Sequence, residues 1–352
     1  MKVKILYLVL ILFPILGIGQ DIHFSQITRT ELLINPALTG MFDGNIRATM
    51  NWKDQWRSVD KSFRTYASSA EFSFGRGLIR QPAYYAIGIH AAKDVSGDIE
   101  LGTTNIGVSV NSLIKIARNQ RLAIGAQTAY SKTGFIPAAM EWGSQYSGLS
   151  FDPALYDGEG IEYLPQQYWD FSAGVAWWYH KTTLTSPAFV PLDAKFGMAV
   201  YHINRPENSF VLTQSSRLPM RASFHGSALF ATPLEGVYWY PSLNIAVQGP
   251  QQEILPGIMG KLTVKPGSKM TGMTAEFSLA AGFSMRFTNV FDAIIPQVFL
   301  EFKTFSLGMS YDINLSNLNL ASNYRGGFEF SIRFTNPDGF THKNPFRKVA
   351  TI

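Results

Sequence analysis

The sequence of 352 residues contains no cysteine. This absence excludes a disulfide scaffold and a thiolate metal site. Charged residues are also scarce, at 16% of the chain, against about 25% in a typical soluble domain. The net charge of +5 comes from basic residues that are scattered along the chain, which argues against a nucleic-acid-binding patch. Stability must therefore come from apolar burial and backbone pairing.

Long apolar runs are nearly absent as well. The one strong run, Ile5–Leu16, follows two lysines and precedes the small residues Gly17 and Gly19. It is shorter than the roughly 18 to 20 residues of a membrane-spanning helix. We therefore expect residues 1–19 to be a cleaved signal peptide, with a retained anchor as the alternative. No later run could span a bilayer as a helix, so a membrane location would require a closed β-barrel.

Aromatic residues make up 14% of the chain, and in many segments apolar and polar residues alternate with a period of two. In residues 46–53, Ile, Ala, Met and Trp alternate with Arg, Thr, Asn and Lys, as expected for a lipid face and a lumen face. The same alternation returns in residues 277–287 and 328–334. Marking every such segment predicts about fourteen strands, near residues 45, 65, 85, 104, 121, 168, 194, 219, 239, 254, 275, 293, 304 and 326.

These strands predict an all-β fold, a transmembrane outer-membrane barrel of about 14 antiparallel strands over residues 44–334. A soluble β-sandwich is the alternative, but the aromatic residues at strand ends favour the membrane. We expect the long Ser131–Gln167 connection to lie outside the cell. An even strand number places both the N- and the C-terminus in the periplasm, with residues 335–352 as a short tail.

The sequence offers no catalytic or metal-binding pattern. The motifs of zinc proteases, serine hydrolases and phosphate-binding loops are missing, and the six histidines are dispersed. His90, His180 and His225 fall on expected lumen positions, where hydrogen bonding is the simplest role. Charges of both signs also fall there, which favours pairing across the lumen over an ion-selective pore. We predict neither an enzyme nor a cofactor.

Several motifs together resemble one family. They are FSQ (Phe24, Ser25, Gln26), LLINPALTG (with Asn35, Pro36, Ala37 and Gly40), Gln55-Trp56, GMSYDINLSNL (with Tyr311, Asp312 and Asn314) and the final GGFEFSIRF. This combination resembles the PorP/SprF family of the type IX secretion system of the Bacteroidetes.

The resemblance implies an outer-membrane barrel that assists secretion or surface anchoring of a specific exported protein, such as an adhesin used in gliding motility. Its implied partners are that exported protein, other type IX secretion components and outer-membrane lipid. The resemblance also implies that residues 20–43 occupy the lumen, as the Asn-Pro-Ala segment does in fatty-acid transporters.

Physical reasoning agrees with a plug at residues 20–43, because a barrel of about fourteen strands encloses more volume than its own side chains fill. We expect Leu32, Leu33, Ile34 and Leu38 to pack on the lumen wall, and Asn35 to cap the turn at Pro36. The alternative is a disordered periplasmic leader, which the apolar content disfavours.

Two functions remain open at this point. In the first, the barrel holds or escorts an exported protein, and aromatic residues of the long loop contact it. Those residues are Trp142, Tyr146, Phe151 and Tyr156. In the second, the barrel is a channel for small molecules, similar to a fatty-acid transporter or a porin. The first function is favoured, mainly by the family resemblance.

Overall fold

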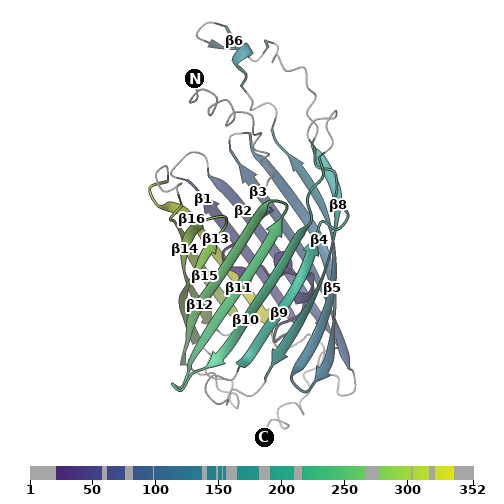
Figure 1. Ribbon diagram of the computed structural model, residues 1–352, viewed down its shortest axis with the longest axis vertical. Helices are drawn as coiled ribbons and strands as arrows, with labels where there is room; N and C mark the ends of the chain where they lie inside the picture. Colours follow the sequence, from purple (N-terminus) through teal and green to yellow (C-terminus); the bar gives the residue numbers. More distant parts are fainter. Residues whose placement is uncertain are drawn as a thin grey trace, which may run out of the picture.

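The computed structural model describes residues 21–57, 62–75, 82–97, 99–136, 141–147, 150–152, 154–155, 165–181, 191–209, 216–265, 277–302, 304–316 and 322–336. Fourteen strands form a closed barrel in the order β1-β16-β15-β14-β13-β12-β11-β10-β9-β8-β5-β4-β3-β2 (Figure 1). All neighbouring strands are antiparallel. The prediction of a fourteen-stranded antiparallel barrel is therefore confirmed.

The barrel strands are 10 to 17 residues long. Their bounds are β1 Ile46–Gln55, β2 Phe63–Phe74, β3 Ala83–Ser96, β4 Leu101–Ala117, β5 Gln120–Gly134, β8 Gln166–His180, β9 Pro191–Tyr201, β10 Arg221–Ala231, β11 Val237–Gln248, β12 Gln251–Lys265, β13 Phe277–Phe287, β14 Phe291–Phe302, β15 Phe305–Asn314 and β16 Arg325–Asn336. Two further strands, β6 Tyr146–Ser147 and β7 Ser150–Phe151, pair only with each other.

The predicted alternation gives each strand a lumen face and an outward face. In β1, Arg47, Thr49 and Lys53 are buried, whereas Met50 between them is 65% exposed. In β16, Glu329 and Ser331 are buried, and Phe328 and Ile332 are exposed. The outward residues are mostly apolar, as lipid contact requires.

The two ends of the barrel differ. At one end, which we call the base end, β1 begins and β16 finishes, with Ile46 opposite Asn336. At the other, the loop end, β1 finishes at Gln55 opposite Gly327. The β6–β7 pair lies beyond the loop end (Figure 1). At the base end, for example, the two-residue turn Arg118-Asn119 joins β4 and β5.

The N-terminal segment, residues 21–45, runs through the interior of the barrel. It contains three short helices: η1 Ile27–Arg29, α2 Glu31–Ile34 and η2 Pro36–Leu38. Asp21 contacts Arg221 and Gln248 near the loop end, and Gly40 contacts Glu71 toward the base end. The segment therefore descends from the loop end to the start of β1.

The first and the last described residues lie at opposite ends of the barrel, whereas the termini themselves lie outside the described residues. Asp21, the first described residue, lies toward the loop end because the strand ends there hold its carboxylate, while Asn336 lies at the base end. The predicted signal peptide (residues 1–19) and all but the first two residues of the predicted C-terminal tail lie outside the described residues. Among the described residues, no helix has the length and apolar content needed to cross a membrane.

Candidate functional site: the N-terminal segment inside the barrel

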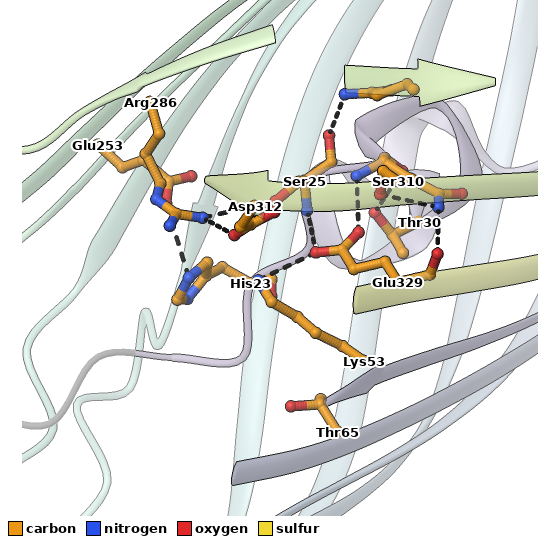
Figure 2. Close-up of polar contacts among 12 residues, drawn as sticks. His23, Ser25, Thr30, Lys53, Thr65, Glu253, Arg286, Ser310, Asp312 and Glu329 are labelled. Atoms are coloured by element: carbon orange, nitrogen blue, oxygen red, sulfur yellow. Dashed lines mark hydrogen bonds and ion pairs between the residues drawn. The ribbon is translucent and has the colours of Figure 1, made fainter. Parts of the chain in front are cut away.

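The FSQ motif lies against strands β1 and β14–β16 near the barrel seam (Figure 2). The Glu329 carboxylate accepts the backbone N–H groups of Ser25 and Gln26, at 2.8 and 3.1 Å. The Nζ atom of Lys53 lies 3.0 Å from the same carboxylate. Lys53 and Glu329 are both fully buried, so each charge depends on the other for compensation.

The side chains of the motif are bonded as well. The Ser25 hydroxyl donates to Asp312 at 3.1 Å, and Arg286 holds the other oxygen of Asp312 at 2.6 Å. The Gln26 amide donates to Ser310 at 3.1 Å and accepts from Ser331 at 2.6 Å. The polar groups of Ser25 and Gln26 thus find partners on β14, β15 and β16.

Glu31 in α2 pairs with cations from three strands. Its carboxylate contacts Arg47 of β1, Lys195 of β9 at 3.1 Å and Arg333 of β16 at 3.6 Å. Burial alone would raise the pKa of Glu31, but the three cations outweigh burial and lower the pKa to about 2. Glu31 is therefore a carboxylate at neutral pH, and it joins opposite walls of the barrel through the segment.

The Asn-Pro-Ala turn is built around Asn35. The Asn35 side-chain oxygen accepts the Ala37 N–H at 2.8 Å and so caps η2, as the sequence predicted. Its Nδ2 lies 3.1 Å from the Val175 carbonyl, 3.2 Å from the Met198 carbonyl and 3.0 Å from His225 Nε2. One asparagine therefore organises its own turn and fixes that turn to β8, β9 and β10.

Three wall glycines make room for this turn. They are Gly125 of β5, Gly174 of β8 and Gly197 of β9, and Gly125 pairs directly with Gly174. A Cβ at Gly125 would lie 2.5 Å from the Pro36 carbonyl carbon, and one at Gly174 would collide with the Asn35 side chain. Only glycine lets the backbone of the turn approach the wall this closely.

The base-proximal part of the segment is mainly apolar. Ala37, Leu38 and Met41 are buried in one cluster with Tyr84, Leu113, Ala123, Ala176 and Trp178 of the wall. Leu32 is buried as predicted, whereas Leu33 and Ile34 are only half-buried. Asn111 donates to the carbonyls of Ala37 and Thr39, at 2.6 and 2.7 Å. The segment is thus bonded to the wall along its full length.

Near the loop end, Asp21 lies beside His202, the first residue after β9. His202 Nε2 is 2.6 Å from Asp21, and its Nδ1 is 3.0 Å from Asp170 of β8. Burial would lower the pKa of His202, but the two carboxylates outweigh it and raise the pKa to about 9. Burial likewise opposes ionisation of Asp21, yet Arg221 and His202 lower its pKa below the usual range.

The family motifs outside the segment have separate places. Gln55 and Trp56 lie at the loop end of β1, where the Trp56 N–H donates to the Gly326 carbonyl at 2.8 Å. Asp312 and Asn314 face inward and are buried, whereas Tyr311 faces outward and is 40% exposed. Phe24, Pro36 and Gly40 are buried in the segment. Of these motifs, FSQ and Asp312 meet directly, and Gln55-Trp56 does not reach the segment.

The aromatic residues of the long loop are only partly brought together. Tyr146 of β6 and Phe151 of β7 are paired, with ring centroids 5.5 Å apart. Trp142 precedes a short helix, η4 Gly143–Gln145, and Tyr146 is 48% exposed. Tyr156 lies outside the described residues.

Sequence reasoning missed the charged residues of the segment. Arg29, Glu31 and Asp21 were not singled out, although Glu31 makes the most ion pairs of the three. A lone carboxylate in the apolar run ELLINPAL could have indicated a buried ion pair, because an unpaired charge there would be costly. Its partners could not be inferred, since they come from strands distant in sequence.

The described residues hold no group of three or more His, Asp and Glu side chains suited to a metal ion. The lumen histidines instead have hydrogen-bonding partners: His90 with Asn105 at 2.8 Å, His180 with Asp193 at 2.9 Å and His225 with Asn35. Their contacts fit the structural role expected for them.

Comparison with known families decides the identity. Residues 17–334 match the family described as "Type IX secretion system membrane protein PorP/SprF". The chain belongs to the PorP/SprF family. It is an outer-membrane β-barrel of the type IX secretion system, and the family is not one of known enzymes. The resemblance inferred from the motifs is thereby confirmed.

Solved structures similar to this chain are bacterial barrel proteins of low sequence identity. CdiB from Acinetobacter baumannii has a TM-score of 0.42 and 6% identity, and the match covers 82% of this chain and 60% of CdiB. A deltaS2S3 mutant of the TodX monoaromatic hydrocarbon channel has a TM-score of 0.42 and 13% identity, with 87% and 94% covered. The β domain of the Bordetella autotransporter BrkA has a TM-score of 0.37 and 12% identity, with 84% and 100% covered. Comparison with curated protein sequences found no significant match.

Proposed function

We propose that this PorP/SprF barrel assists the secretion or surface anchoring of one specific exported protein, such as an adhesin, with residues 20–43 acting as a plug. The observation that carries the proposal is the bonding of the N-terminal segment to the lumen wall within a family of secretion-system barrels. A segment held by buried ion pairs at Glu31 and Glu329 fits a closed accessory barrel better than an open pore.

The contacts with the wall support the plug because they involve both sides of the barrel. Ser25 and Gln26 bond to β15 and β16, and Asn35 bonds to β8 and β9. A solute crossing the lumen would have to displace or bypass these contacts. Selective handling of an exported protein then depends on surfaces outside the lumen, such as the loops.

The long loop supplies a surface for the exported partner. We propose that Trp142, Tyr146, Phe151 and Tyr156 contribute to binding it, because exposed aromatic side chains provide large contact areas at protein interfaces. Tyr146 and Phe151 already form a paired aromatic surface beyond the loop end of the barrel.

A comparison of surface proteomes tests the proposal. Deletion of the gene should remove one adhesin-like protein or a small set from the cell surface, while other type IX cargo is still secreted, because specificity resides in differential contacts. Alanine at Trp142 and Tyr146 should weaken partner binding by about 1 to 4 kcal/mol if they are anchors. An unchanged surface proteome together with slower uptake of a small apolar solute would reject the secretion role in favour of a transporter.

A further inference from the structure

Three cations lie together at the base end of the β4–β5 hairpin. They are Lys115 near the end of β4, Arg118 in the turn and Arg121 near the start of β5, and we call them the base-end basic patch. Lys115 and Arg121 are direct cross-strand partners. Like charges in directly opposite positions destabilise a sheet, so a nearby counter-charge would relieve this pair.

Lys115 and Arg121 lie on the lumen side of their strands. Two positions deeper in the same strands, Leu113 and Ala123 are fully buried in the cluster that holds the segment, and residues two apart share one face of a strand. Leu122, the outward neighbour of Arg121, is apolar and 37% exposed. The two cations therefore face the aqueous mouth of the barrel, and the lipid side of the hairpin is apolar.

Lys115 and Arg121 differ from other cations that face the lumen. Neither has an ion-pair partner within the part of the chain that the structure describes. Other lumen-facing cations of the wall each contact a carboxylate, namely Arg47, Lys53, Lys195, Arg221, Lys261, Arg286 and Arg333.

The connections that flank the patch in strand order add no acidic residue. Residues 76–81, between β2 and β3, contain two arginines, and residues 182–190, between β8 and β9, contain no charged residue. Among the described base-end residues of β3, β8 and β9, the one carboxylate is Asp193. It accepts from Trp178 at 2.8 Å and lies 2.9 Å from His180, so it is already engaged. This sector of the base end thus carries an excess of positive charge.

Arg121 is held in place by an aromatic ring. Its Cζ atom lies 5.0 Å from the centroid of the Tyr84 ring, and Tyr84 is buried and donates its hydroxyl to the Gly40 carbonyl at 3.1 Å. Stacking covers one face of the guanidinium and leaves the N–H groups at its edge for a carboxylate. One residue, Tyr84, therefore separates the patch from the N-terminal segment.

We propose that the base-end basic patch docks an acidic peptide segment, rich in Asp and Glu, of a periplasmic component of the secretion system. The cations are spread over two strands and a turn, which suits several carboxylates better than one small anion. The guanidinium of Arg121 matches a carboxylate in shape, and Lys115 and Arg118 are exposed. The base end is the periplasmic end that strand parity predicts.

The charge of the chain's own C-terminal residues does not suit this patch. Residues 337–352 contain Lys343, Arg347 and Lys348 against the single acidic side chain of Asp338. The complementary charge must therefore come from another protein, and membership of a secretion-system family supports association with further components. The proposal goes beyond the handling of an exported protein, which we assign to the opposite end of the barrel.

The experiment uses the full chain in nanodiscs of phosphatidylcholine, which has no net charge. The probe is fluorescein-labelled octaglutamate, and binding is measured by fluorescence anisotropy in a low-salt buffer, where exposed charges are least screened. Wild type should bind octaglutamate and not octaglutamine. The double variant Lys115→Gln/Arg121→Gln should bind octaglutamate about tenfold more weakly, because two ionic contacts are lost.

Lys93→Gln/Lys132→Gln is the matched control. It removes the same net charge from exposed positions of β3 and β5 near the loop end, and it should bind octaglutamate as tightly as the wild type. Heat-modifiable gel migration verifies that each variant is folded. Equal affinities in the two double variants would show that octaglutamate responds only to overall charge, and would overturn the proposal.

A second measurement separates a protein partner from anionic lipid. Nanodiscs that also contain phosphatidylglycerol are analysed by native mass spectrometry for retained lipid. Retention should be the same in wild type and in Lys115→Gln/Arg121→Gln. Retention that falls in this variant, without octaglutamate binding by the wild type, would assign the patch to lipid and overturn the proposal. Neither assay contains an exported protein, so both are independent of the surface-proteome test.

Discussion

Ser25 donates its hydroxyl to Asp312 at 3.1 Å, although the two residues are 287 positions apart in the chain. Asp312 is at the same time the ion-pair partner of Arg286, so a contact within the wall also holds its orientation. The contact joins the start of the N-terminal segment to strand β15. Two of the family's sequence motifs thus form one hydrogen-bonded site.

Replacement of Gly174 by alanine should displace the Asn-Pro-Ala turn. The new Cβ would collide with the Asn35 side chain, so the cap on η2 and its wall contacts would be lost together. Because the chain has no cysteine, a single cysteine introduced by Ala37→Cys can be labelled specifically, and its reactivity reports displacement of the turn. Ala37 is fully buried, and its thiol should react with a membrane-impermeant maleimide much faster in the Gly174→Ala background.

Gly260→Ala is the matched control for that experiment. Gly260 is also a strand glycine, but the nearest atom to its Cβ would be 3.7 Å away, in ordinary contact distance. The labelling rate of Ala37→Cys should stay at the wild-type value in this background. Equal rates in the two glycine variants would mean that the turn does not depend on the close approach at Gly174.

Glu31→Gln should destabilise the barrel by an amount on the order of 3 kcal/mol, because it leaves buried cations without their counter-charge. Among the described residues, Lys195 and Arg333 have no other ion-pair partner, whereas Arg47 keeps Glu71 at 2.7 Å. The midpoint temperature of heat-modifiable gel migration measures the loss. Glu207→Gln, at an exposed pair, should leave this midpoint unchanged.

The contact of Asp21 with His202 should weaken in alkaline solution. The folded pKa of His202 is raised from 6.5 to about 9, so its ionic contribution is fully present below about pH 6.5 and is lost as the pH rises through about 9. A spin label at Ile22→Cys should become more mobile across this range. In His202→Gln the label should show no transition in the same range, and a transition that persists would assign the effect to another group.

Deletion of Phe24–Gly40 should convert a nearly closed barrel into one with large, noisy conductance in planar bilayers. The deletion removes the contacts at Ser25, Glu31 and Asn35, so the lumen would be free of the segment. A wild-type protein that already conducts like an open porin would refute the plug. Deletion of loop residues 141–147 should leave conductance unchanged, because they lie beyond the barrel end.

Most of the fold could be predicted from local sequence patterns. The alternation in β1 and β16 follows from side-chain period alone, so the strand number and lumen faces could be predicted from the sequence. The cap made by Asn35 was also predictable, because it acts within three residues. The partners of Glu31 were not, since Arg47, Lys195 and Arg333 come from three strands whose spatial relation depends on barrel closure.

The direction of the N-terminal segment could not be predicted either. Strand parity fixes the side on which β1 begins, but it says nothing about the path of the residues before β1. That path is set by charge pairs such as Asp21 with Arg221, which have no local sequence pattern. The expectation that both termini lie in the periplasm stays a prediction, because residues 1–20 and 337–352 lie outside the described residues.

The contacts of the segment also bear on how the barrel assembles. The seam between β1 and β16 pairs the first strand with the last, and the FSQ motif bonds to β15 and β16, which are synthesised at the end. Contacts of such long sequence separation form slowly. The FSQ residues therefore lack these partners until the final strands arrive, whereas Asn35 can bond to β8 and β9 earlier. The last strands thus complete two structures at once, the barrel wall and the site that holds the FSQ motif.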